Sequence, residues 1–304
     1  MSFFTKKKIL ITHDGTFHTD DLFATATLSL LNKGNIKIIR TRNPEIIKKG
    51  DYVYDVGGIY NPQENKFDHH QKGGAGERKN SIPYASFGLV WKTYGEQLCG
   101  SKEVAEIIDQ KIAQPIDAID NGVDIIKSLF DGIIPYGADQ VFLDYIPTWK
   151  ESIKDIDKIF KMQVLKVAEL LKREIKIIKD DLEGKNILIE AYEKSKDKRI
   201  IIIIDKNLPR YLYQYTLSKF AEPLYLILPS GHSNVWKIEA IRKSSETMES
   251  RKSFPENWRG IFDIEELRKV SEISDIIFCH KGGFLAETVS KEGAISLAQK
   301  ALLA

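Results

Sequence analysis

Cysteine is nearly absent from this chain of 304 residues, and the two that occur, Cys99 and Cys279, lie far apart with no C-x-x-C pair. This excludes a disulfide framework and a zinc site built from thiolates, and it is typical of a reducing compartment. Long apolar runs are missing as well, since unbroken ones such as residues 200–204 fall far short of the ~18 residues that a membrane-spanning helix needs. The apolar stretch after the basic residues 6–8 is too short for a signal peptide. We therefore expect a soluble protein of the cytoplasm, or of the nucleus in a eukaryote.

An excess of one charge is also lacking, because 45 Lys and Arg face 43 Asp and Glu, for a formal net charge of +2. This balance excludes a polybasic binder whose affinity for nucleic acid comes from charge alone. A nucleic acid remains possible as a substrate if the basic surface is local. Because chains beyond ~250 residues tend to split into domains, we expect two of them.

The first half of the chain alternates between strand and helix patterns, which favours a parallel sheet in an α/β fold. The apolar runs predict strands at residues 9–12, 36–39 and 52–56. The helical patterns lie at residues 22–31, 86–98 and 104–119. Asp20 or Asp21 is the expected N-cap of the first helix.

Residues 150–184 form one long amphipathic helix by their apolar spacing, with Gly184 expected at its end. A second, smaller α/β unit follows. We expect its strands at 199–204, 224–228, 235–241 and 276–279, and its helices at 264–270 and 293–303. The charged residues 193–198 place the boundary near 184–198, giving a first domain of residues 1–184 and a second of 198–304.

Four of the six histidines lie within the first 70 residues, in two short motifs. The first motif, His13-Asp-Gly-Thr-Phe-His18-Thr-Asp20-Asp21, sits between a predicted strand and a predicted helix, where sites form in parallel sheets. Helix capping explains its acids but not both histidines, and its like charges repel unless a cation neutralises them. A metal site is therefore the favoured interpretation.

Three further elements add candidate ligands. Asp55 ends a predicted strand before a glycine pair, although such aspartates often only form turns. Asp68-His69-His70 is an uncommon triplet, and imidazole is the commonest side-chain ligand of transition metals. Asp117 and Asp120 share one face of a predicted helix, and the sequence leaves open which of them is the ligand.

Imidazole and carboxylate ligands without thiolate suit Mn²⁺, Mg²⁺, Fe²⁺ or Co²⁺, with Zn²⁺ possible, and Mn²⁺ is our first choice. A single metal ion that keeps one coordination position open for water or substrate needs fewer ligands than these motifs supply. Two ions bridged by one carboxylate would use them all, and such pairs are typical of phosphatases and nucleases.

The order of these motifs resembles the DHH phosphoesterase superfamily, and more closely its melanocyte proliferating gene (MYG) family. The MYG pattern continues in Pro255-Glu-Asn-Trp-Arg259-Gly and His280-Lys281-Gly282-Gly283-Phe284, so the resemblance spans residues ~9–300. The superfamily's usual first motif is His-x3-Asp-x-Asp, whereas here His18 stands in place of the first aspartate, as in the MYG family.

The resemblance implies a DHH-type catalytic domain, a DHH-associated substrate-binding domain, and hydrolysis of phosphodiesters with two metal ions. Carried over to this sequence, His13 and His18 hold one ion, Asp20, His69 and Asp120 hold the other, and Asp55 bridges both. His70 would face the phosphate and stabilise developing charge, and Asp117 competes with Asp120. The substrate-binding candidates are Arg251, Arg259, His280, Lys281, Gly282 and Gly283.

The leading hypothesis is thus a metal-dependent 3′–5′ exonuclease acting on short single-stranded RNA or nucleotides. One alternative keeps the chemistry but takes a small phosphoester, a cyclic dinucleotide or pyrophosphate. Another is a non-catalytic protein that binds metal or nucleic acid. The sequence leaves the oligomeric state open.

Overall fold

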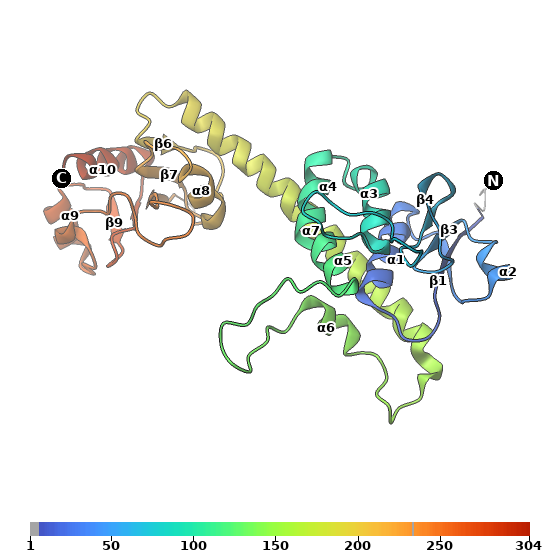
Figure 1. Ribbon diagram of the computed structural model, residues 1–304. Helices are drawn as coiled ribbons and strands as arrows, with labels where there is room; N and C mark the ends of the chain where they lie inside the picture. The colour runs from blue at the N-terminus through green and yellow to red at the C-terminus, as the bar shows by residue number, and fades with distance from the viewer. Residues whose placement is uncertain (1–5, 233) are drawn as a thin grey trace. The chain divides into compact units, whose positions relative to one another are not determined.

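The computed structural model describes residues 6–232 and 234–304, which fall into two compact units that divide between Lys179 and Asp180 (Figure 1). We call them unit 1 and unit 2 and describe each by itself. No helix in the described part of the chain combines the length and the apolarity needed to cross a membrane.

Unit 1 is built on a five-stranded sheet in the order β2-β1-β3-β5-β4. The strands are β1 (Lys8–Thr12), β2 (Ile36–Arg40), β3 (Tyr52–Tyr54), β4 (Tyr60–Asn61) and β5 (Lys66–Phe67). Strands β2, β1, β3 and β5 run parallel, and only β4 is antiparallel. Leu10, Ile11 and Phe67 are fully buried, so the sheet centre forms part of the core. The predicted parallel α/β sheet is confirmed.

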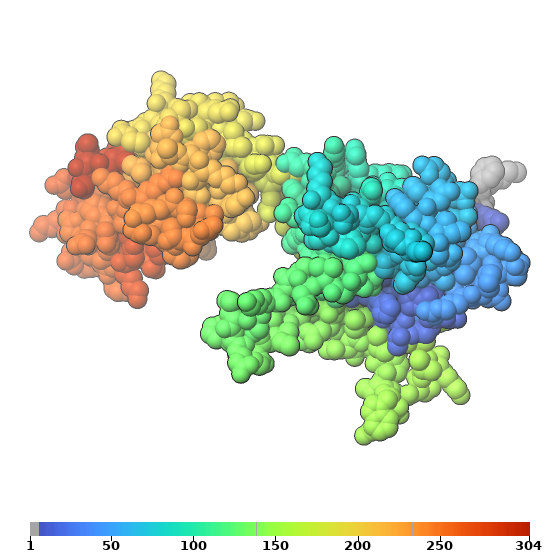
Figure 2. All heavy atoms as spheres, in the orientation of Figure 1, coloured from blue at the N-terminus to red at the C-terminus, as the bar shows by residue number. Residues whose placement is uncertain are grey.

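The helices that belong wholly to unit 1 are α1 (Thr19–Leu31), α2 (Pro44–Ile47), α3 (Ser86–Cys99), α4 (Lys102–Ile108), α5 (Gln114–Asp120) and α6 (Ala138–Leu143). Short 3-10 turns add Pro62–Glu64 and Ile153–Asp155. The helix predicted over residues 104–119 is real but interrupted, because a π turn (Asp109–Ala113) joins α4 to α5. Figure 2 shows the segment after α5, in green, standing out from unit 1, where Leu129, Phe130 and Trp149 are exposed.

The long helix α7 (Ile156–Lys194) begins in unit 1 and ends in unit 2. The expected end at Gly184 is wrong, because the helix continues for ten more residues. Gly184 marks a close approach instead: a Cβ there would lie 2.5 Å from Leu212 Cδ2. A glycine that reads as a helix terminus in the sequence is therefore used for packing against α8 (Arg210–Leu217).

Unit 2 contains a second five-stranded sheet in the order β6-β7-β8-β10-β9. Its strands are β6 (Ile200–Ile202), β7 (Tyr225–Pro229), β8 (Trp236–Ala240), β9 (Ile276–Cys279) and β10 (Leu285–Thr288). Only β6 and β7 pair in parallel. The remaining helices are α9 (Ile264–Ser271) and α10 (Lys291–Leu303), with a 3-10 turn at Glu256–Trp258. One buried cluster involves α9 and α10, and another involves α8 and the end of α7, which agrees with the predicted α/β character.

Candidate metal centre

Three of the candidate motifs follow neighbouring parallel strands of unit 1. His13 comes directly after β1, Asp55 after β3 and Asp68 after β5, and these strands are adjacent in the order β1-β3-β5. The carboxyl ends of parallel strands meet at one edge of a sheet, where sites form. Asp55 itself adopts the left-handed conformation with φ 55°, which aspartate tolerates better than most residues.

Helix α1 brings the rest of the first motif to the same edge. His18 is its N-cap, so the expectation that Asp20 or Asp21 caps the helix is wrong. The helix starts earlier because His18 is extended and its N–H donates to Asp21 Oδ1 at 2.9 Å. Asp20 is buried in the first turn, where it accepts hydrogen bonds from the N–H groups of Ser86 and Phe87 at the start of α3.

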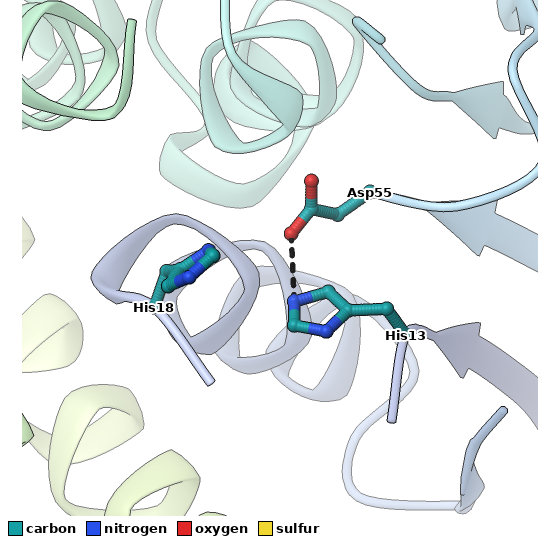
Figure 3. A group of neighbouring side chains, drawn as sticks. All are labelled: His13, His18 and Asp55. Atoms are coloured by element: carbon teal, nitrogen blue, oxygen red, sulfur yellow. Dashed lines mark ion pairs between the residues drawn. The ribbon is translucent and has the colours of Figure 1, made fainter. Parts of the chain in front are cut away.

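The imidazoles and carboxylates converge around Asp55. His13 Nε2 lies 3.2 Å from Asp55 Oδ2, and His69 Nε2 lies 3.4 Å from Asp55 Oδ1. His69 Nε2 also lies 3.2 Å from Asp120 Oδ2. Figure 3 shows the ring of His13 pointing at the Asp55 carboxylate, with His18 at the start of α1 beside it. The two carboxylate oxygens of Asp55 therefore face different imidazoles, Oδ2 that of His13 and Oδ1 that of His69.

The potential ligand atoms fall into three overlapping groups, each with all atoms within 4.8 Å of one another. The groups are His13, His18 and Asp55; Asp55, His69 and His70; and Asp20, His69 and Asp120. All the metal ligands proposed from the sequence thus occur in these groups, and Asp55 is shared by two of them. We call the residues of these groups the ligand cluster: His13, His18, Asp20, Asp55, His69, His70 and Asp120.

Several buried atoms of this region have no hydrogen-bond partner: His13 Nε2, His69 Nε2, Asp21 Oδ2 and both carboxylate oxygens of Asp55. Buried polar atoms are normally satisfied, and each one left over costs about 1–3 kcal/mol. Imidazole nitrogens and carboxylate oxygens that converge without donors fit a divalent cation. The residues present therefore match the metal chemistry expected from the sequence.

The electrostatics of the cluster would favour a cation, because its buried carboxylates lie close together. Burial, together with the charges of Asp55 and Asp120, raises the pKa of Asp20 well above its usual range. Burial raises the pKa of Asp21 to about 7. Burial opposes ionisation of Asp55 too, but the imidazoles of His13 and His69 hold its pKa below the usual range. Burial also opposes protonation of both histidines, but Asp55 and the neighbouring carboxylates outweigh it and raise their pKa values.

The two aspartates of α5 have different surroundings. Asp120 faces His69, and its Oδ1 lies 3.9 Å from His18 Nδ1. Asp117 is turned away and buried, where it accepts hydrogen bonds from Arg78 Nη1 at 2.7 Å and from the Gly88 N–H at 3.0 Å. The geometry therefore favours Asp120 as the ligand and gives Asp117 a structural partner.

Asp68 and Asp21 support the cluster in ways that the sequence did not assign. Asp68 Oδ1 accepts hydrogen bonds from both the N–H and the Nδ1 of His70, and Asp68 Oδ2 accepts one from the Gly58 N–H. This fixes the half-exposed His70 ring with Nε2 as its uncommitted nitrogen. Asp21 Oδ2 lies 3.4 Å from His13 Nε2, which makes Asp21 a further candidate ligand.

In unit 2 the predicted substrate-binding motif is a turn after β9 that satisfies many of its own polar groups. The Gly282 N–H donates to His280 Nδ1 at 2.9 Å, and the Gly283 N–H donates to the His280 carbonyl at 2.8 Å. The backbone N–H groups of both glycines are therefore bonded within the turn. Lys281 and Gly282 remain exposed.

The two candidate arginines of unit 2 differ in position. Arg259 lies against the turn, since a Cβ on Gly283 would come within 2.5 Å of Arg259 Nε, and Nε donates to the Phe254 carbonyl. Arg251 lies elsewhere and donates to the carbonyls of Ser218, Ala221 and Pro223. Its guanidinium is thus taken up by the fold, and we do not carry it into a substrate site.

Comparison with known proteins agrees with this geometry. A family model, MYG1_exonuc, described as an uncharacterised protein family (UPF0160), matches residues 9–302. The MYG1 exonuclease of Mus musculus is 28% identical over 322 residues, covering 96% of this chain and 84% of the relative. The MYG1 protein of Dictyostelium discoideum is 30% identical over 321 residues, covering 96% of each.

Among solved structures, RecJ in complex with Mn²⁺ from Thermus thermophilus is 12% identical, with a TM-score of 0.27, and the match covers 98% of this chain and 52% of that one. That score is too low to support an argument. The family match, in contrast, extends over nearly the whole sequence, and the resemblance seen in the motifs is confirmed. This chain belongs to the MYG1 exonuclease family.

Proposed function

We propose that this protein is a metal-dependent 3′–5′ exonuclease that hydrolyses phosphodiesters of short single-stranded RNA at the ligand cluster. The observation that carries the proposal is the set of buried nitrogen and oxygen atoms around Asp55 that have no hydrogen-bond partner. The family relatives named exonucleases point to the same chemistry. The near-neutral net charge favours short substrates, since long duplexes require many phosphate contacts.

Two divalent ions, Mn²⁺ in the first instance, would occupy the cluster. Two of the three groups of ligand atoms share Asp55, and the third is linked to them through His69, which supports an assignment in which His13 and His18 hold one ion and Asp20, His69 and Asp120 hold the other. Asp55 offers one oxygen to each set, because His13 faces Oδ2 and His69 faces Oδ1. When bound, such ions lower the pKa of water towards neutrality and neutralise charge on the phosphate.

The protein's own groups position and stabilise the substrate. His70 is 61% exposed beside the cluster, and Asp68 orients its ring, so that Nε2 can donate a hydrogen bond to a phosphate oxygen when the ring is protonated. In unit 2, Lys281, Arg259 and the His280 ring are the groups that we assign to holding the strand. Gly282 and Gly283 shape that turn.

The test is hydrolysis of a short end-labelled RNA with added Mn²⁺ by the wild type and by Asp55→Asn. Asparagine tolerates the left-handed backbone of residue 55, so the substitution removes charge with little strain. We expect stepwise shortening by the wild type and a loss of at least about 10³-fold in the variant. Asp124→Asn, at an exposed aspartate outside the cluster, is the matched control.

RNA that stays intact with wild-type protein shown by elemental analysis to hold metal would contradict the nuclease. The label that survives gives the polarity, and 5′ to 3′ shortening would refute that part of the proposal. A series of RNAs of decreasing length, extended to pyrophosphate and a cyclic dinucleotide, separates RNA from small phosphoesters.

A further inference from the structure

A cavity of about 670 Å³ opens beside the ligand cluster in unit 1. It lies against α2 and the ends of β3 and β5, and Asp55, Asp68 and His70 form the part of its wall that it shares with the cluster. Binding pockets for small molecules have volumes of about 300–1,000 Å³, so the cavity has room for one nucleotide. A base or sugar bound in the cavity could therefore belong to the same molecule as a phosphate that reacts at Asp55.

Part of the cavity wall is apolar. Ile47 from the end of α2, Val53 from β3 and Val56 after Asp55 line it. The neighbouring pair Gly57-Gly58 has φ values of 99° and 70°, which glycine adopts without strain, and it leaves this side of the wall without side chains. Apolar surfaces of this kind accept the faces of a nucleobase, because every base has a flat π-face.

Basic and acidic side chains both line the cavity. Arg42 Nη1 donates to the carboxylate of Asp14 at 2.7 Å and to the carbonyl of the same residue at 2.5 Å. Its guanidinium is therefore held in place at low entropic cost, as a plane on which a base can stack. Lys48 and Lys66 also line the cavity, but Lys48 pairs with Glu45 and Lys66 pairs with Glu64, which lines the cavity as well. Arg42 is therefore the cation of the lining that offers a flat face to a base.

We propose that this cavity binds the terminal nucleobase and its sugar while the adjoining phosphate lies at the ligand cluster. This inference rests on the proposed function. The substrate feature that the cavity would select is a strand end whose base is unpaired and unstacked. Asp68, the carboxylate at the inner wall, is already bonded to the N–H groups of Gly58 and His70. Recognition therefore comes from stacking and tolerates any base.

The test compares two ligands that differ only in the base, adenosine 5′-monophosphate and ribose 5-phosphate. Neither contains a phosphodiester, so binding is measured by calorimetry with Mn²⁺ present and without turnover. The wild type should bind the nucleotide about ten-fold or more tightly than the sugar phosphate. Ile47→Glu places a charge in the apolar wall and should remove this ratio. Ile46→Glu is the matched control on the same short helix, outside the cavity wall, and should keep it.

Equal binding of the two ligands by the wild type, or no measurable binding of the nucleotide at millimolar concentration, would overturn the inference. Retention of the ratio in folded Ile47→Glu would do the same. Should that variant fail to fold, Arg42→Ala replaces a side chain that is 61% exposed and should narrow the ratio several-fold. An unchanged ratio there would count against the cavity.

The proposed function is tested apart from the cavity with bis(p-nitrophenyl) phosphate, which has no nucleobase. Suppose that the wild type and Ile46→Glu hydrolyse this compound, but the wild type binds adenosine 5′-monophosphate and ribose 5-phosphate equally. That result would refute the proposed role of the cavity and leave the proposed nuclease intact. A base-dependent binding ratio without any hydrolysis would instead refute the nuclease and leave a nucleotide-binding protein.

Discussion

The ligand cluster of unit 1 and the His280–Gly283 turn of unit 2 both looked functional in the sequence, but their polar atoms behave in opposite ways. Around Asp55, buried nitrogen and oxygen atoms lie close together without hydrogen-bond partners. In the turn, His280 accepts hydrogen bonds from Gly282 and Gly283, and nearby Arg259 donates to a backbone carbonyl. The buried atoms of the cluster thus call for a ligand, whereas the backbone of the turn satisfies itself and leaves only exposed groups such as Lys281 to contact a substrate.

The largest expected difference between the two regions comes from paired histidine substitutions. His70→Ala should lower kcat by about 10²-fold or more, because it removes a donor to the developing charge. His280→Ala should raise KM by roughly ten-fold or less with kcat retained, since its Nδ1 is already bonded within the turn. The measurement is steady-state hydrolysis of a short RNA, with bound metal determined in each variant. Equal effects on kcat would remove the distinction between the regions.

A second test uses the competition between metal and protons at His13 and His69. Both pKa values lie above the ordinary value of 6.5, and each ring must be neutral to bind a metal. We therefore expect the affinity for Mn²⁺ to rise by about ten-fold or more between pH 6 and pH 8, with protons released on binding. Calorimetry in buffers of different ionisation enthalpy counts those protons, and His232→Ala is the control. An affinity that does not change with pH would contradict the assignment.

In the absence of metal, a rising pH weakens the contribution of His13 and His69 to the stability of the fold, whereas it strengthens their binding of metal. Their folded pKa values are raised, so their attraction to Asp55 stabilises the fold fully below the unfolded value of about 6.5. This contribution is lost as the pH rises through the folded values. Metal-free protein should thus lose this increment of stability over the range in which metal binding strengthens.

The smallest effect is expected at Arg251, which the sequence placed in the substrate site. Arg251→Ala should lower the free energy of unfolding by about 1–3 kcal/mol, because it leaves carbonyls without donors, and kcat and KM should be unchanged. Arg199→Ala breaks only an exposed ion pair with Asp197 and should leave the free energy of unfolding nearly unchanged. Urea denaturation measures both. A higher KM for Arg251→Ala at unchanged stability would restore it to the substrate site.

The sequence predicted the parallel sheet and the residues of the cluster because strand ends and chemical type are local properties. It could not separate Asp117 from Asp120, since residues three apart share a helix face and only the packing of Arg78 and Gly88 distinguishes them. It misplaced the end of α7 because the demand for a glycine at position 184 comes from Leu212, which follows 28 residues later. Tertiary contacts of this kind leave no local signal.

The left-handed backbone of Asp55 limits which residues position 55 of this chain can accept. Asparagine keeps the conformation but loses the charge, and glutamate keeps the charge but fits the conformation poorly. Of these three residues, only aspartate combines the negative charge with a good fit to the left-handed backbone. Neither conservative substitution should therefore give an active protein. We expect saturation mutagenesis of position 55 to yield no active variant, while position 124, an exposed aspartate outside the cluster, should tolerate several.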